Sequence, residues 1–539
     1  MIRTLTILSL LAVAFSSCKP TERTALKKKH AAQPVEAPAG LPQEQPVDVP
    51  AQPPVVQAEP APAVEPPAEP VVTAPAAALP EIAHSQLVVN ATLQKYNAMQ
   101  PWEKENPRQS RALGVYMGEG RVLTVGRVVD SATYVELILP DVSRTVVARV
   151  LRYDADLNLA LLTVEHEEDA SIFDTRTPLP LGEALNRGDS ATYAGLINGV
   201  EPVHVDLCAE NVAGDKVPLM VLRAARPLPE GQTTGAPVVR DGKLCGLGVG
   251  YKKQEHLMQV VNAELIQRFL TQESAGVPVL GMKFTQLDDP QFRKYLKLDA
   301  AANGLYLSKV LPGSAAEAAG LKEGDVVTAL EGLPLDNLGR CDHPRYGLHP
   351  ASVLMRGVKD MGQELEITIS RGGESRKVQV RLDRAAQENA LFRPQKEGDQ
   401  PRYVVWGGML FQPLTSTLLE EIRARNNGML PLELQLLELN QEELKKEGYT
   451  EPVGLTFVLP TEATQGYDEL RFCHLRAVNG KPVYSFEDLP ALLDEQTENG
   501  LIKLEFNKAP YAAYVERSAV DAVNEQLQQS AIPRLRVVE

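Results

Sequence analysis

Short apolar runs separated by turns dominate the chain from residue 87 to about residue 273. Each run has the length of a β-strand, and glycine-containing turns such as 118–120 and 241–242 lie between the runs. Many short strands at this spacing predict an all-β barrel or sandwich. The expected strands cover residues 114–117, 121–124, 134–139, 145–151, 157–164, 219–222, 236–239 and 244–249.

Beyond this region the pattern combines helical and strand periodicity. Residues 263–270, at the end of the first region, are helix-like, whereas 364–369 and 377–382 alternate polar and apolar residues as half-buried strands do. Further strands are expected near the C-terminus, over residues 402–415, 454–459, 475–478 and 501–506. The second half of the chain is therefore predicted to contain α+β domains.

A helical insertion over residues 418–425 and 432–447 is expected between the strands of this last region. It is apolar at Leu436, Leu437 and Leu439 and then becomes charged. Two interpretations remain open: the apolar positions pack within their own domain, or they form a contact between copies in an oligomer.

Composition divides the chain further. Fourteen of its 41 prolines fall between Pro34 and Pro80, and residues 19–83 contain few large side chains. Such a segment cannot bury enough apolar surface to offset the entropy of ordering it, so we expect a disordered tether. Proline-rich chains extend about 3.1 Å per residue, which gives this tether a reach on the order of 100 to 200 Å.

Residues 1–18 have the pattern of a cleavable export signal. One positive charge at Arg3 precedes an apolar stretch over 5–15, which is too short to serve as a spanning helix. Its end, 15–18, resembles a bacterial lipobox, which implies that Cys18 is lipidated; a plain secretory signal is the alternative. Lys19 resembles the pattern of outer-membrane lipoproteins. The expected location is the bacterial cell envelope, lipid-anchored and facing the periplasm, at the outer membrane more than the inner.

Charge and cysteine content narrow the classes of partner. The formal net charge is −15 and lysine and arginine form no long cluster, so nucleic acid is not an expected partner.

Apart from Cys18, the cysteines are widely spaced and lack a CxxC motif. We therefore expect neither a metal site nor a disulfide framework, with a single bridge left open, and no cofactor.

Three segments carry a family resemblance. Residues 114–130, 156–162 and 235–246 follow one another in the order and spacing of the landmark segments of the HtrA/Do-like serine proteases. The resemblance implies that residues 84–275 form a trypsin-like double β-barrel. Proteases of this family need a serine nucleophile, a histidine base and an orienting aspartate.

Each of these three positions differs here. By resemblance, Arg127 stands at the histidine position, Asn158 at the aspartate position and Thr234 at the serine position. Arginine stays protonated, with a pKa above about 12, and cannot accept a proton near neutral pH. In the chymotrypsin-type triad the Asp-to-Asn change alone lowers kcat about 10⁴-fold. Gln232 replaces a glycine that helps to shape the oxyanion hole.

No other residue obviously restores the chemistry. No serine lies between Ser190 and Ser274, and His166, His204 and His256 fall outside the three landmark segments. The sequence therefore predicts a pseudoprotease with no catalytic residues. The alternative is an active serine-type endopeptidase of envelope quality control with a rearranged site.

The remaining segments resemble PDZ domains. Residues 276–386 contain segments close to those of the PDZ domains that follow HtrA-type proteases, and 400–539 resemble the divergent second PDZ module of plant Do-like proteases. By resemblance, Val279, Leu280, Gly281 and Met282 form the loop that holds a peptide C-terminus, and residues 351–361 form the helix lining the groove. A groove that is filled or used only for domain contacts is the alternative.

The combined prediction is a mainly β protein: a trypsin-like double β-barrel followed by two PDZ-like α+β domains and preceded by a disordered, proline-rich tether. Its expected role is that of a membrane-tethered scaffold or regulator that binds peptides or C-termini of envelope proteins. A homo-oligomer, a trimer or a multiple of one, is also expected from the resemblance.

Overall fold

The computed structural model describes residues 82–538, except 198–200, 215, 273–275, 299–302, 358, 396–397 and 531. The predicted signal over 1–18, with Cys18, and nearly all of the predicted tether lie outside the described residues. No helix in the described part of the chain is long and apolar enough to span a membrane.

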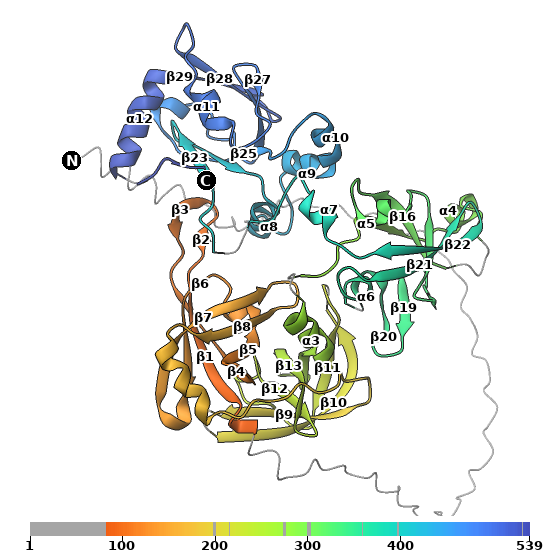
Figure 1. The fold of residues 1–539 in the computed structure, drawn as a ribbon. Helices are drawn as coiled ribbons and strands as arrows, with labels where there is room; N and C mark the ends of the chain where they lie inside the picture. The colour runs from red at the N-terminus through yellow and green to blue at the C-terminus, as the bar shows by residue number, and fades with distance from the viewer. Residues whose placement is uncertain are drawn as a thin grey trace, which may run out of the picture.

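Two closed six-stranded barrels form the first body (Figure 1), which confirms the predicted trypsin-like double barrel. Most of the predicted strands are present, and α3 (Ala263–Thr271) follows the second barrel as expected. The first barrel is built from β1 (Gln86–Leu93), β4 (Arg108–Gly118), β5 (Arg121–Val125), β8 (Leu159–Val164), β7 (Arg144–Asp154) and β6 (Ala132–Leu139). The second is built from β10 (Glu201–Ala213), β11 (Leu219–Ala224), β14 (Leu257–Asn262), β13 (Lys243–Lys252), β12 (Pro237–Arg240) and β9 (Ser190–Ile197).

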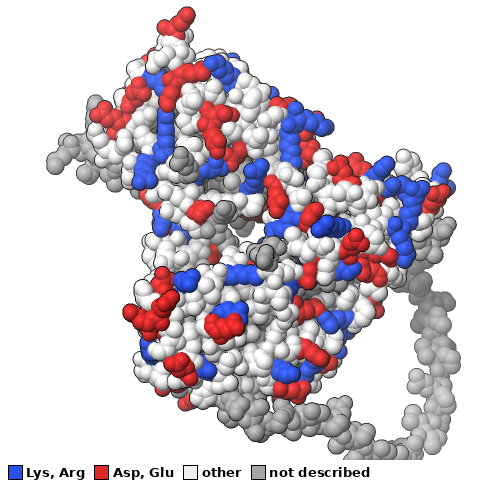
Figure 2. Space-filling model, viewed as in Figure 1, with Lys and Arg blue, Asp and Glu red and all other residues white. Residues whose placement is uncertain are grey.

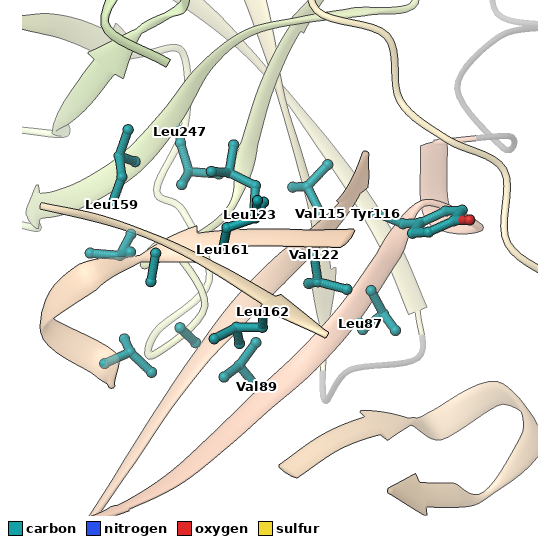
Figure 3. Packing of buried hydrophobic residues seen from close by; sticks show 14 of the residues in the cluster. Leu87, Val89, Val115, Tyr116, Val122, Leu123, Leu159, Leu161, Leu162 and Leu247 are labelled. Atoms are coloured by element: carbon teal, nitrogen blue, oxygen red, sulfur yellow. The ribbon is translucent and has the colours of Figure 1, made fainter. Parts of the chain in front are cut away.

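Branched aliphatic side chains fill the first barrel (Figure 3). Leu87 and Val89 on β1 face Val122 on β5 and Leu162 on β8, and all four are essentially inaccessible to solvent. Leu247 from the second barrel belongs to the same cluster. The two barrels therefore share a continuous apolar core, which fixes the relative positions of the loops at their junction.

The second body contains an antiparallel sheet in which five strands lie side by side, with β15 at one edge and β22 at the other. Its helix α6 (Ala351–Gly357) ends earlier than the predicted 351–361, and the carbonyl of its last residue, Gly357, accepts a hydrogen bond from Arg268 of the first body. The strand order in the sheet is β15 (Met282–Gln286), β16 (Leu305–Val310), β17 (Val326–Leu330), β21 (Glu364–Arg371) and β22 (Glu374–Arg381). The other helices of this body are short: α4 (Pro290–Tyr295), α5 (Ala315–Ala318) and α7 (Ala385–Glu388).

Smaller strands complete this body. β18 (Leu333–Pro334) pairs with β17, and β19 (Arg340–His343) forms a separate hairpin with β20 (Gly347–Pro350). Near that hairpin, Arg345 forms an ion pair with Glu264 on α3. The second body is thus tied to the first by charged contacts, which include those of Arg268, Arg345 and Arg384.

The third body is an antiparallel sheet whose core surrounds Trp406, Phe411 and Phe486. Its strands run β29 (Ala512–Glu516), β28 (Leu501–Phe506), β26 (Cys473–Val478), β25 (Val453–Val458), β24 (Met409–Pro413), β23 (Tyr403–Trp406) and β30 (Arg536–Val537), with β27 (Lys481–Pro482) beside β26. Its helices are α8 (Ser416–Arg425), α9 (Leu432–Leu439), α10 (Gln441–Lys446), α11 (Leu489–Asp494) and α12 (Arg517–Ser530).

The predicted helical insertion is present as α8 to α10 and has two kinds of apolar position. Leu434 and Leu437 are buried with Leu418 and Leu419 in a cluster of their own, which supports packing within the domain. Leu436 and Leu439 are about half exposed, at 48% and 58%. Packing within the domain therefore accounts for only part of the apolar pattern.

A hairpin from the first body contacts the third. β2 (Tyr96–Asn97) and β3 (Gln100–Lys104) extend away from the first barrel toward the third body (Figure 1). The Gln412 side chain donates to the Ala98 carbonyl at 3.1 Å, and the Trp102 ring meets Tyr403 edge-on at 5.9 Å. On the face shown in Figure 2, basic and acidic side chains are interspersed.

Candidate functional site

Arg127, Asn158 and Thr234 lie together at the junction of the two barrels. Arg127 is in the single turn that follows β5, Asn158 directly precedes β8, and Thr234 precedes β12. The Arg127 backbone N–H donates to Asn158 Oδ1 at 2.8 Å, and the Arg127 guanidinium Nη2 donates to Thr234 Oγ1 at 3.0 Å. The fold therefore brings together three residues that are far apart in the sequence.

The backbone around Asn158 explains how it reaches this position. Asn158 has φ +55°, a left-handed conformation that asparagine tolerates better than most residues. Its carbonyl accepts from the Gly126 N–H at 2.9 Å. Just before it, the Asp154 carboxylate accepts from the backbone N–H groups of Asp156 and Leu157 and so closes the turn.

Thr234 is held by close backbone contacts between the barrels. Its carbonyl accepts from the Leu113 N–H of β4 at 2.9 Å. Gly235 has φ +75°, and a Cβ at this position would lie 1.9 Å from the Leu113 carbonyl oxygen. Only glycine fits there, so the threonine hydroxyl is presented to Arg127 by a backbone that cannot easily shift.

The arrangement reverses the hydrogen bonding that activates a serine-type nucleophile. Activation needs a base that accepts the hydroxyl proton, whereas Arg127 donates to the hydroxyl oxygen. Partial desolvation lowers the pKa of the Arg127 guanidinium. An arginine remains cationic even so, and the geometry as described holds no general base at Thr234.

His166, His204 and His256 of this body lie in other segments of the chain. Neither His166 nor His256 is hydrogen-bonded to Thr234 in the part of the chain that the structure describes. His166 precedes a short helix after β8, and the His256 carbonyl accepts from the Ala224 N–H in the turn before β14. The His204 carbonyl on β10 accepts from Arg226.

Gln232 lies at the position where the resemblance expects a glycine. Its carbonyl accepts from the Tyr193 hydroxyl at 3.0 Å. Burial raises the pKa of that tyrosine and keeps its proton available for this bond. The Gln232 side-chain oxygen Oε1 is buried and has no hydrogen-bond donor among the described residues.

The loop of residues 279–282 leads into the edge strand of the second body. Leu280 is buried in the same apolar cluster as Leu354 and Met355 of α6, so loop and helix share one core. The Leu280 and Gly281 carbonyls accept from Ala316 and Leu311. These bonds fix the loop against the rest of the domain.

The same loop retains unused donors. The Val279 N–H donates to the Asp383 carbonyl, whereas the N–H groups of Leu280 and Gly281 have no acceptor among the described residues. β15, which starts at Met282, pairs only with β16, so its outer edge is unpaired in the described sheet. Free N–H groups beside an open strand edge are what C-terminal peptide recognition by strand addition requires.

Comparisons with known proteins identify the relatives of this chain. PDZ-domain families match residues 273–342 and 392–537. "Protease Do-like 2, chloroplastic" of Arabidopsis thaliana is 27% identical over 467 residues, which cover 83% of this chain and 74% of that protein. This chain is a homologue of the HtrA/Do-like serine proteases.

Other known proteins align with a smaller part of this chain. "Periplasmic serine endoprotease DegP" of Escherichia coli (strain K12) is 24% identical over 290 residues, half of this chain and 56% of that protein. A solved structure, "HtrA-type protease AlgW with decapeptide", is 17% identical, covers 57% of this chain and 97% of that chain, and has a TM-score of 0.40.

The two PDZ domains of this Do-like homologue differ at the strand edge. In the second, β24 pairs with β23 on one side and β25 on the other, and β30 from the C-terminus pairs with β23. Both edges of β24, the strand that follows the turn at Gly407 and Gly408, are therefore paired in the described sheet. This contrasts with β15 of the first PDZ domain.

Several supporting residues were not predicted from the sequence. Tyr193, Asp154 and Arg268 each form contacts with residues distant in the sequence. Asp154 Oδ2, for example, accepts from the Gly276 N–H at 2.6 Å and joins the turn before Asn158 to the start of the first PDZ domain. No sequence motif marks such residues, because their partners are defined only by the packing of the bodies. Among the described residues no group of His, Cys, Asp and Glu is placed to hold a metal ion.

Proposed function

We propose that this Do-like homologue is a pseudoprotease that binds polypeptides without cleaving them. The observation that carries the proposal is the hydrogen bond from the Arg127 guanidinium to the Thr234 hydroxyl. A cation that donates to the hydroxyl oxygen cannot remove its proton, and Asn158 supplies an amide where a triad needs a carboxylate.

Peptide binding is assigned to the first PDZ domain. Support comes from the unused N–H groups of Leu280 and Gly281 and from the unpaired edge of β15. A peptide C-terminus would place its carboxylate at residues 279–282 and extend along β15 as an added strand. The second PDZ domain lacks such an edge at β24, which favours a structural or assembly role for it.

The proposed setting is the bacterial envelope. The sequence features that support it are the lipobox-like residues 15–18 and the proline-rich segment 19–83. Lipid on Cys18 would anchor the chain, and the segment would let the folded bodies work away from the membrane surface. Polypeptides with exposed C-termini in the periplasm are the proposed partners, and a homo-oligomer is the proposed assembly.

Hydrogen exchange on the full chain tests the PDZ assignment. The probe is a hexapeptide with an apolar last residue, either as the free acid or as the C-terminal amide. We expect the free acid to slow exchange over residues 279–286, because new hydrogen bonds protect the loop and the β15 edge, and the amide to have at least about tenfold weaker effect.

A pair of charge variants completes this experiment. Met282 is half-buried at the loop, and Gln286 is exposed at the far end of β15. We expect Met282→Asp to abolish the protection, since the new carboxylate repels that of the peptide, and Gln286→Asp to retain it. Protection that is the same for acid and amide, or unchanged in Met282→Asp, would refute the assignment.

A further inference from the structure

Helix α9 of the third body is apolar on two opposite sides. Five of its eight residues are leucine. Leu434 and Leu437 are buried in the apolar cluster that α9 shares with α8. Leu432, Leu436 and Leu439 remain 63%, 48% and 58% exposed. A helix that is apolar all round is normally covered on every side, so the exposed side of α9 lacks a cover that its composition predicts.

The three exposed leucines form one stripe. Their spacing, i, i+4 and i+7, places them on the same face of a helix. Met429, three residues before Leu432 in the segment that leads into α9, is 68% exposed as well. Apolar positions that repeat at intervals of three and four residues are the pattern of a seam between two helices. The stripe therefore fits a partner helix.

Acidic side chains accompany the stripe along the chain. Residues 433–447 contain five glutamates and two lysines, and both lysines are already paired with glutamates of α10. Glu443 and Glu447 follow Leu439 at intervals of four residues and are exposed. A partner that carries basic residues beside its apolar face is favoured by this charge.

The same charge argues against two other occupants. A second copy would bring an identical acidic segment to the stripe, on a chain whose formal net charge is −15. The chain's own proline-rich segment is acidic too: residues 31–81 contain seven carboxylates and no lysine or arginine. Its prolines also disfavour a helix. A separate protein with a basic amphipathic helix matches both the spacing and the charge of the stripe.

We propose that α9 is the docking site for a basic amphipathic helix of another protein. Leu432, Leu436 and Leu439 pack against the apolar face of that helix, and Glu443 and Glu447 attract its lysines or arginines. The site is in the third body, apart from the carboxylate loop of the first PDZ domain. It gives the protein a second class of partner, which is recognised by a helix instead of a C-terminus.

Fluorescence anisotropy with the full chain tests this site. The probe is a labelled helical peptide of about 18 residues with a leucine stripe flanked by lysines, compared with a peptide of the same composition and scrambled order. Both end in an amide, which removes the carboxylate that the first PDZ domain would hold. We expect the striped peptide to bind at least about tenfold more tightly than the scrambled one.

Surface variants locate the binding. Leu436→Gln combined with Leu439→Gln should weaken binding of the striped peptide at least about tenfold, and Glu443→Lys combined with Glu447→Lys about threefold or more. Leu348→Gln is the control and should leave binding unchanged, because Leu348 is 53% exposed on β20 of the second body. All five positions are exposed, and circular dichroism checks that each variant is folded.

Two results would overturn the proposal. One is equal affinity for the striped and scrambled peptides, or equal affinity of wild type and the leucine variant, which would mean that the acidic chain attracts any cationic peptide. The other is a full-length oligomer that the leucine variant converts to a smaller species in analytical ultracentrifugation, which would assign the stripe to a second copy.

Discussion

The Arg127 guanidinium and the Thr234 hydroxyl are joined by a 3.0 Å hydrogen bond across 107 residues of sequence. The trypsin-like fold places the residues that follow β5 and precede β12 side by side, whatever side chains they carry. In this chain the pair consists of a cation and a hydroxyl instead of a base and a nucleophile. The guanidinium donates to the hydroxyl oxygen, and this direction of the bond is the basis of the proposal that the site does not carry out proton transfer.

The first prediction concerns the glycine that positions Thr234. Gly235→Ala should destabilise the first body by several kcal/mol, on the order of 3 or more, because the added Cβ would lie 1.9 Å from the Leu113 carbonyl oxygen. Gly231→Ala is the matched control, since Gly231 also has positive φ but nothing lies within 4 Å of its Cβ position. Thermal melting of both variants checks this; equal melting temperatures would contradict the described packing.

The second prediction separates the backbone and side-chain roles of Asn158. Asn158→Ala should cost about 1 to 2 kcal/mol, because it loses the hydrogen bond from the Arg127 N–H and places alanine at φ +55°. Asn158→Gly loses the same hydrogen bond but tolerates the left-handed backbone, so it should cost less. Chemical denaturation monitored by circular dichroism compares the two; a larger loss in the glycine variant would argue against this explanation.

The third prediction is a pH dependence of the third body. Burial lowers the pKa of His474 to about 3 in the folded protein, against an ordinary value near 6.5. A depressed histidine pKa means that the unfolded state binds the proton first. Stability is therefore full above about pH 6.5 and falls as the pH drops toward 3, by on the order of 2 kcal/mol at pH 5.

Tryptophan fluorescence can follow this effect, because Trp406 lies in the core of the third body and Trp102, the other tryptophan of the chain, packs against that core. The urea midpoint should be lower at pH 5 than at pH 7.5, both for wild type and for the surface control His84→Gln. His474→Leu should flatten the difference. A wild-type midpoint that does not change between these pH values would contradict burial of a neutral His474.

The fourth prediction concerns the C-terminal strand. Deleting residues 534–539 removes β30 from β23, including the 2.7 Å bond from the Val405 N–H to the Leu535 carbonyl. The third body should lose on the order of 3 kcal/mol, measured by urea denaturation with tryptophan fluorescence.

The control for this deletion is Arg536→Gln. It removes only the ion pair with Asp494, which is half-exposed, and should cost less than about 1 kcal/mol. A deletion no more harmful than the control would show that β30 is dispensable.

Much of the fold could be predicted from local pattern. The runs 121–124 and 244–249 are strands β5 and β13, and 263–270 is α3, because alternation and helical spacing reflect which side of an element is buried. The three site positions followed from the order of the landmark segments. Because residue 127 is an arginine, the sequence alone excluded a histidine base at that position.

Other features depend on packing between distant segments. The direction of the Arg127 side chain toward Thr234 is a choice among rotamers that the sequence does not specify. Exposure of Leu436 beside buried Leu437 depends on which face of α9 meets α8. The pairing of β30 with β23 joins the C-terminus to residues over a hundred positions earlier, and a two-residue strand carries too little pattern to reveal it.

The most direct test of the central claim is turnover of an unfolded substrate. Purified full-length chain, its Thr234→Ala variant and buffer alone are incubated with unfolded casein, and new peptide termini are identified by mass spectrometry. We expect the same background of termini in all three samples, because no base removes the Thr234 proton. Casein cleavage by the wild type that Thr234→Ala abolishes would contradict it.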